Sequence, residues 1–242
     1  MEKNLDRVLV IGSHALDFLW RAGGTIAAYT QKGWPVRIIN LTYGERGESD
    51  SLWEKNPGIT EEEVKQIRRE EATKAAGILG AEIEFWDWGD HPLHISDEQV
   101  LEIAKVIKEY RPKIILTQFS NDTLNHDHPV TLQAVLRAVR CARVAGVFPE
   151  YPRIPLPDIF MYDPSQPEFF GFKPDTFIDI TDVIDTKVKA MSVAGAQEYL
   201  ISTYQARAAY RGTNARMFNG DGKVKYAEAF VRFSPYVGKE FC

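Results

Sequence analysis

Short, uninterrupted apolar runs alternate along the chain with longer amphipathic stretches. The apolar runs are typical of strands buried on both faces of a sheet, and they occupy residues 7–12, 36–42, 83–88, 113–118 and 176–180. Stretches with helical spacing lie between or after them, at residues 19–32, 60–79, 97–110, 129–144 and from 185 to about 210. This order predicts one α/β domain over residues 1–242, with a mostly parallel sheet in a three-layer, Rossmann-like arrangement.

Local signals mark the ends of the clearest helix. Thr60 and Glu63 fit a capping box, acidic residues crowd the first turn, and Gly80 stands where the helix is expected to end. The proline-rich stretch at residues 148–174 is predicted to be a long surface excursion and not a linker between domains.

Composition excludes several classes of partner. The net charge of −5 and the interleaving of basic with acidic residues predict no nucleic-acid partner. No apolar stretch approaches the roughly 20 residues that a membrane span needs, so no membrane contact is expected. Cys141 and Cys242 are interpreted as free thiols in a reducing compartment, and the cytoplasm is the predicted location.

Polar segments follow three of the predicted strands, at the edge where α/β sheets bind ligands. They are SHALDF (13–18), YGERGES (43–49) and FSNDTLNHDHPVT (119–131). His14 and Asp17 are three residues apart at a turn into a helix, and His128 stands where a later helix starts. Two imidazoles and a carboxylate suit zinc or iron(II) with positions left for water and substrate. On spacing alone, hydrogen-bonded loop histidines and a helix-capping Asp17 explain the pattern equally well.

The wider pattern resembles a known enzyme family. SHALDFLWRAGGTIA resembles the opening motif of the PIG-L/LmbE family of zinc-dependent de-N-acetylases, usually written His-Pro-Asp-Asp, and NHDHPVT resembles its second motif. LTYGERGES and IRREEATKAAGILG also match, so the similarity spans residues 7 to about 145. The resemblance implies that His14, Asp17 and His128 bind Zn²⁺ or another divalent transition metal such as Fe²⁺.

One departure from the deacetylases changes the expected chemistry. Their general base is the first aspartate of the opening motif, and this chain has Leu16 there. DFLWRAGGTIA, YGERGES and GDHPL look more like a branch that also lacks this aspartate, the 4-oxalomesaconate (4-carboxy-2-hydroxymuconate) hydratases of aromatic-acid breakdown. In that branch the glutamate of the GERGES loop is assigned the activation of water, so the resemblance implies this role for Glu48.

The resemblance therefore implies a metal-dependent hydratase, a hydro-lyase acting on a small, anionic, unsaturated carboxylate. The alternatives are a zinc-dependent N-acyl deacetylase in which Glu48 or Asp127 replaces the base, and a binding protein without activity. The hydratase branch is expected to use a later histidine as its acid, whereas this chain has none after His128 and offers Ser165 in the matching stretch. Relatives often form homo-oligomers, and this chain is compatible with that state.

Other candidates each have a structural alternative. In the family Asp127 supports the metal site, whereas here it could equally cap a helix. Arg68 is expected either to bind a substrate carboxylate or to pair with Glu71 three residues on. Arg207 is expected to recognise an anion or to lie on a solvated helix face. His91, like the nearby His94, is either structural or a stand-in for the missing acid.

Overall fold

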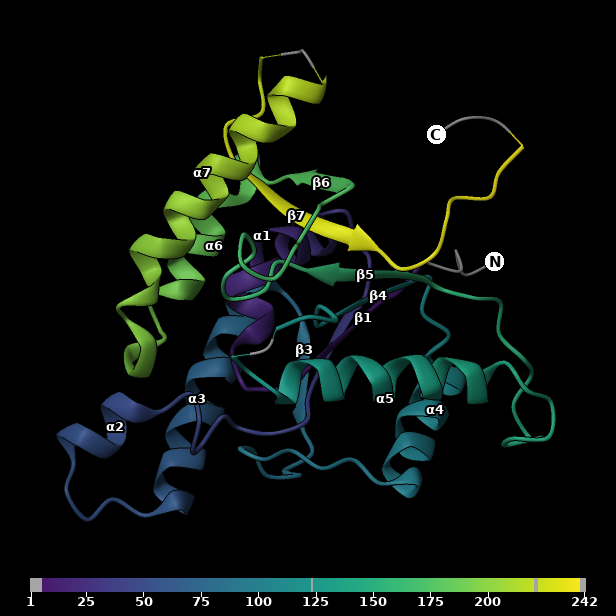
Figure 1. Cartoon of the computed structure of the whole chain (residues 1–242), viewed down its shortest axis with the longest axis horizontal. Coiled ribbons are helices and arrows are strands. Elements are labelled where there is room, and N and C mark those ends of the chain that lie inside the picture. Colours follow the sequence, from purple (N-terminus) through teal and green to yellow (C-terminus); the bar gives the residue numbers. More distant parts are fainter. Residues whose placement is uncertain (1–5, 123, 220–221, 240–242) are drawn as a thin grey trace.

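The computed structural model describes residues 6–122, 124–219 and 222–239, and their strands form one seven-stranded sheet of order β3-β2-β1-β4-β5-β7-β6 (Figure 1). Five neighbouring strands run parallel, and β7 is antiparallel to both β5 and β6. The bounds are β1 Val8–Gly12, β2 Val36–Asn40, β3 Glu82–Phe85, β4 Ile114–Thr117, β5 Asp158–Tyr162, β6 Thr176–Asp179 and β7 Ala227–Arg232.

Helices cover both faces of this sheet. Their bounds are α1 Asp17–Gln31, α2 Asp50–Lys55, α3 Glu61–Leu79, α4 Asp97–Tyr110, α5 Asp127–Ala142, α6 Ile184–Met191 and α7 Leu200–Asn219. Helices α4 and α5 pack together on one face, and α1, α3, α6 and α7 lie on the other (Figure 1). The predicted three-layer α/β fold with a mostly parallel sheet is confirmed.

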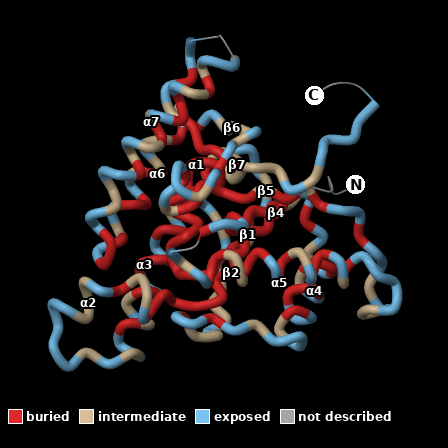
Figure 2. The backbone as a smooth tube through the Cα atoms, in the orientation of Figure 1, coloured by how far each residue is buried: buried red, intermediate tan, exposed pale blue. Residues whose placement is uncertain are grey.

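Strand β1 shows why its apolar run has no polar interruption. Val8 and Val10 face the core under α1 and α3, whereas Leu9 and Ile11 face the core under α4 and α5. Because successive side chains of a strand point to opposite faces, a strand between two helix layers must be apolar at every position. Figure 2 shows the central strands as the most continuously buried part of the chain.

The structure bears out the predicted ends of α3. The Thr60 hydroxyl accepts from the backbone N–H of Glu63, the Glu63 carboxylate accepts from the N–H of Thr60, and Gly80 ends the helix in the left-handed region. Elsewhere the observed ends differ from the expected ones. Helix α5 begins at Asp127, two residues before the expected start, and β3 stops at Phe85, ahead of the positive φ of Asp87.

Three elements were not predicted, and one predicted helix is interrupted. The proline-rich excursion contains the strand β5. The helix α2 and the strand β7 have no clear hydrophobic periodicity and were not predicted either. The expected helix from residue 185 is two helices, because residues 195–197 turn against α3, where the Glu71 carboxylate accepts from the N–H of Ala196. Strand β5 exists because it pairs with β4 on one side and β7 on the other, which local sequence does not encode.

Within the described residues, no helix combines the length and the apolar character needed to cross a membrane. Cys141 is a free thiol, as expected, and Cys242 lies outside the described residues.

A buried ion pair joins α1 to α6 and β7. Lys187 Nζ lies 2.6 Å from Glu228 Oε1, and the two side chains are 2% and 3% exposed. Lys187 also donates to the carbonyl oxygen of Trp20, while the Glu228 carboxylate accepts from the N–H groups of Gly24 and Thr25. The pair thus bonds directly to the backbone of the helix that begins at Asp17.

Removing the cation alone should be costly. Lys187→Met leaves the Glu228 carboxylate buried without its counter-charge, and we expect a loss of about 3 to 5 kcal/mol in the free energy of unfolding by urea titration. Adding Glu228→Gln should recover part of that loss. Lys105→Met, in an exposed pair with Glu109, is the control and should cost less than about 1 kcal/mol. Equal losses for the two lysine variants would contradict a special role for the buried pair.

Candidate metal centre

Loops from three adjacent parallel strands meet at the carboxyl edge of the sheet. Strand β1 leads to His14 and to Asp17 at the start of α1, β2 leads to Glu48, and β4 leads to His128 in the first turn of α5. Each of these four residues offers one ligand atom, and the four atoms all lie within 4.8 Å of one another. His14, Asp17 and His128 are fully buried. The structure therefore brings together the three predicted ligands and the predicted water-activating residue.

Two ring nitrogens at this centre lack hydrogen-bond partners. His14 Nδ1 lies 3.4 Å from Asp17 Oδ2 and 3.3 Å from Glu48 Oε1, and His128 Nε2 lies 3.5 Å from Asp17 Oδ1. Both nitrogens are buried, and neither forms a hydrogen bond. A buried polar atom without a partner costs about 1 to 3 kcal/mol, so two of them facing the same carboxylates fit a site that could bind a metal ion.

The other nitrogen of each ring is held by a carboxylate. His14 Nε2 donates to Asp127 Oδ2 at 3.1 Å, and His128 Nδ1 donates to Asp122 Oδ2 at 2.9 Å. An N–H donated on one side of an imidazole leaves the lone pair on the other nitrogen, which is how proteins orient histidine ligands. In the neutral ring this leaves His14 Nδ1 and His128 Nε2 as the nitrogens that could bind a cation at the centre.

Asp127 is one of the carboxylates that hold the histidine rings. Its carboxylate accepts from the backbone N–H groups of His91 at 3.0 Å and Leu93 at 2.9 Å as well as from His14. His14, Asp90, His91 and Asp127 also lie close enough together to suggest a second cation site. Because Asp90 accepts from the N–H groups of residues 46 and 47, the carboxylates of this group already have donors. We interpret it as a hydrogen-bonded network.

The carboxylates at the centre favour positive charge on the groups that they face. Burial would lower the pKa of His14, but the charge of Glu48 and the contact with Asp127 raise it well above its ordinary value. Burial would raise the pKa of Asp17, but the charges of His128 and Arg21 hold it well below its usual range. For Glu48 the charge of His14 likewise outweighs burial and lowers the pKa. Both carboxylates are therefore ionised and face the two imidazoles.

Asp17 is held firmly on both oxygens. One oxygen accepts from the N–H of His14 at 2.8 Å and from the Gln118 amide at 2.5 Å, and the other accepts from Arg21. Leu16, at the position of the deacetylase base, is instead fully buried in the core under α1. The centre thus receives its free carboxylate from the β2 loop and not from the residue beside Asp17.

A cavity of about 200 Å³ opens beside the centre. Glu48, His91 and Ser165 line it together with Trp20, Arg21, Gly47, Leu124, Asn125, Gln197, Tyr199, Leu200 and Tyr204. Arg21 is the arginine among these residues, and it donates to Ser165 Oγ at 3.0 Å. Arg21 stands one helical turn after Asp17 in the sequence, and this spacing could have identified it as a residue of the site.

The two arginines predicted to bind substrate lie behind this cavity. Arg68 is fully buried and donates to Glu71 and Gln197, while Arg207 donates to the carbonyl oxygens of Pro164 and Ser165. Neither is among the residues that line the cavity, and substrate contact by either stays a prediction. Asp122 was not singled out, although it lies in the segment FSNDTLNHDHPVT that follows β4. Gln197 belongs to no motif, and only the fold brings it to the centre.

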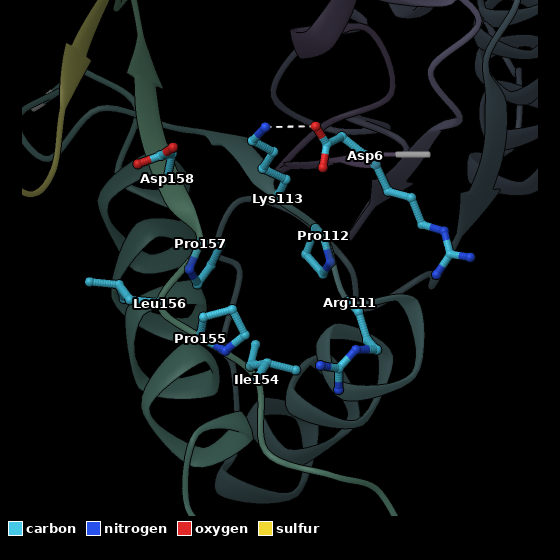
Figure 3. Close-up of a pocket in the computed structure, with 10 residues that line it drawn as sticks. Asp6, Arg111, Pro112, Lys113, Ile154, Pro155, Leu156, Pro157 and Asp158 are labelled. Atoms are coloured by element: carbon cyan, nitrogen blue, oxygen red, sulfur yellow. Dashed lines mark hydrogen bonds and ion pairs between the residues drawn. The ribbon is translucent and has the colours of Figure 1, made fainter. Parts of the chain in front are cut away.

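A second cavity, of about 310 Å³, lies at the end of the sheet opposite to the candidate metal centre (Figure 3). Arg7, Lys113 and Pro157 in its lining immediately precede β1, β4 and β5, so it lies at the amino ends of the strands. Lys113 Nζ pairs with Asp6 at 2.6 Å across it, and the lining contains no histidine. It therefore lacks the ligand set of the carboxyl edge.

Comparisons with known proteins agree with this geometry. The family model described as PIG-L, GlcNAc-PI de-N-acetylase, matches residues 9–139. The chain is 38% identical over 232 residues to 4-oxalmesaconate hydratase of Pseudomonas putida, which covers 95% of this chain and 90% of that protein. It is 30% identical to diacetylchitobiose deacetylase of Thermococcus kodakarensis over 99% of this chain and 87% of that protein.

A solved structure shares the whole fold. The crystal structure of GalB, the 4-carboxy-2-hydroxymuconate hydratase of P. putida KT2440, matches with a TM-score of 0.95 at 36% identity and covers 98% of this chain and 100% of that one. The predicted resemblance is thereby confirmed, as is the prediction of an enzyme. A family match over more than half the chain and a relative this similar along 95% of it show that the protein belongs to the PIG-L family.

Proposed function

We propose that this protein is a metal-dependent hydratase that adds water to a small unsaturated carboxylate, of the class that 4-oxalmesaconate hydratase acts on. One observation carries the proposal. Glu48, on the β2 loop, is a carboxylate at the centre that lines the cavity and has only long hydrogen bonds, of 3.4 and 3.5 Å, while the deacetylase position holds Leu16 in the apolar core. The similarity to two hydratases along nearly the whole chain supports the same assignment.

His14, Asp17 and His128 would hold the cation, for which we propose Zn²⁺ with Fe²⁺ as the alternative. When bound, such a cation supplies Lewis acidity, which makes water a better nucleophile at neutral pH. Asp122 and Asp127 orient the two histidines from behind. A cytoplasmic location fits the free thiol of Cys141.

Hydration forms a carbon–oxygen bond at one end of a double bond and a carbon–hydrogen bond at the other. Glu48 would take the proton that water loses, because it lies at the centre and also lines the cavity. The adjacent carbon needs a proton donor, and we propose His91, whose side chain is 38% exposed and lines the same cavity. Its Nδ1 lies 3.2 Å from Asp127 Oδ2, so the Nε2 edge of the ring is the one turned away from that carboxylate.

The activity test uses the purified chain, loaded with zinc, and 4-carboxy-2-hydroxymuconate as substrate. Hydration breaks the conjugation, so the ultraviolet absorbance should fall, and EDTA should stop the reaction until zinc or iron(II) is returned. Glu48→Gln should lower kcat by about 100-fold or more. If the protein releases amine from an N-acetylglucosamine derivative and leaves the absorbance of 4-carboxy-2-hydroxymuconate unchanged, it is a deacetylase and not a hydratase.

The supporting carboxylates should govern metal affinity. Asp122→Asn removes the charged acceptor of His128 Nδ1, and we expect metal affinity to fall about 10- to 100-fold in a chelator competition assay. Asp97→Asn, on the exposed start of α4, is the matched control and should bind metal like the parent protein. Unchanged affinity in the Asp122 variant would rule out this supporting role.

The role of His91 in catalysis can be tested by comparison with the nearby His94. His91→Gln should lower kcat about 100-fold while metal content and melting temperature stay near those of the parent. His94→Gln is the control, because His94 is exposed and is not part of the cavity lining, and it should keep full activity. Full activity in the His91 variant would require another proton donor.

A further inference from the structure

The amide of Gln197 has one allowed orientation. Its oxygen accepts from Arg68 Nη2 at 2.7 Å and from Trp20 Nε1 at 3.2 Å. Guanidinium and indole nitrogens donate hydrogen bonds and cannot accept them, so the amide oxygen must face both groups. The amide nitrogen consequently faces the other way, where Glu48 Oε2 lies 3.5 Å from it.

The segment that carries Gln197 is fixed to α3 and α2. The Glu71 carboxylate accepts from the N–H of Ala196 at 2.8 Å and from Arg68 Nη1 at 2.8 Å. Ser51 Oγ donates to the carbonyl oxygen of Ala196 at 2.5 Å. Because Gln197 is only 4% exposed, its amide is part of a buried network.

Two amides face the two oxygens of the Glu48 carboxylate. Asn125 Nδ2 lies 3.4 Å from Oε1, and Gln197 Nε2 lies 3.5 Å from Oε2. Both distances are at the long end for hydrogen bonds, so these donors direct the carboxylate more than they stabilise it. Asp17 repels Glu48, and a donor on the far oxygen helps to keep the ionised group in place.

We infer that Gln197 is a positioning residue of the active site, which holds the Glu48 carboxylate toward the cavity, while Arg68 and Trp20 hold the amide of Gln197 in the one useful orientation. The inference rests on the proposed role of Glu48. It gives the buried Arg68 a positioning role that acts through Gln197 and does not require the predicted substrate contact.

Gln197→Glu separates positioning from structure. The new carboxylate still accepts from Arg68 and Trp20, but an oxygen replaces the donor that faces Glu48. We expect kcat to fall about 10- to 100-fold, with KM within about threefold and metal content near the parent value. Because the new carboxyl group is buried beside Glu48, the melting temperature should also fall, but by less than in Gln197→Leu, since Arg68 and Trp20 keep their acceptor. Gln133→Glu adds the same charge at an exposed position on α5 and should leave all four quantities unchanged.

Gln197→Leu provides the structural comparison. It removes donor and acceptor together, so both kcat and melting temperature should fall because two buried donors lose their acceptor. If Gln197→Glu keeps the parent kcat, or if it fails to fold, the inferred orientation or role is wrong. The parent protein is measured in the same assay, and its lack of turnover would instead overturn the proposed hydratase.

Discussion

The candidate metal centre depends on two buried imidazole nitrogens that have no hydrogen-bond partners. His14 Nδ1 and His128 Nε2 face a shared pair of carboxylates, and each ring is held on its far side by another carboxylate. Such an arrangement is costly in the absence of a cation, because burial removes the water that would otherwise satisfy these atoms. The sheet makes it possible by placing the ends of β1, β2 and β4 side by side within a rigid core.

The same geometry is consistent with the proposed role of Glu48 as the base. Leu16 packs into the core one residue before α1, whereas the loop after β2 carries the Glu48 carboxylate to the centre. Two glycines shape that loop. Gly44 has a φ of +68°, and a Cβ on Gly47 would lie 2.1 Å from His91 Nδ1. Glycine at 47 therefore lets the His91 ring pack against the loop that carries Glu48.

Arginines in and beside the cavity lining hold the segment that bears Ser165. Arg21 and Arg207 donate to carbonyl oxygens of residues 163–165, and Arg211 makes two 2.8 Å hydrogen bonds to the Asp163 carboxylate. Arg21 also pairs with Asp17 and so links this segment to the centre. The basic, tyrosine-containing stretch of α7 thus serves the architecture around the cavity.

Local sequence determined a large part of the protein. Apolar runs predicted β1 to β4 and β6, and the capping box and Gly80 predicted α3. The motifs around His14, Asp17, Glu48 and His128 predicted which side chains would meet, because the carboxyl ends of parallel strands lie together. Tertiary structure alone decided the pairing of β5 with β7, the interruption between α6 and α7, and the internal bonding of Arg68 and Arg207. It also brought Gln197 to the centre. Periodicity and motifs report on neighbours in the chain, whereas the partner of a buried polar group is set by which distant segment packs against it.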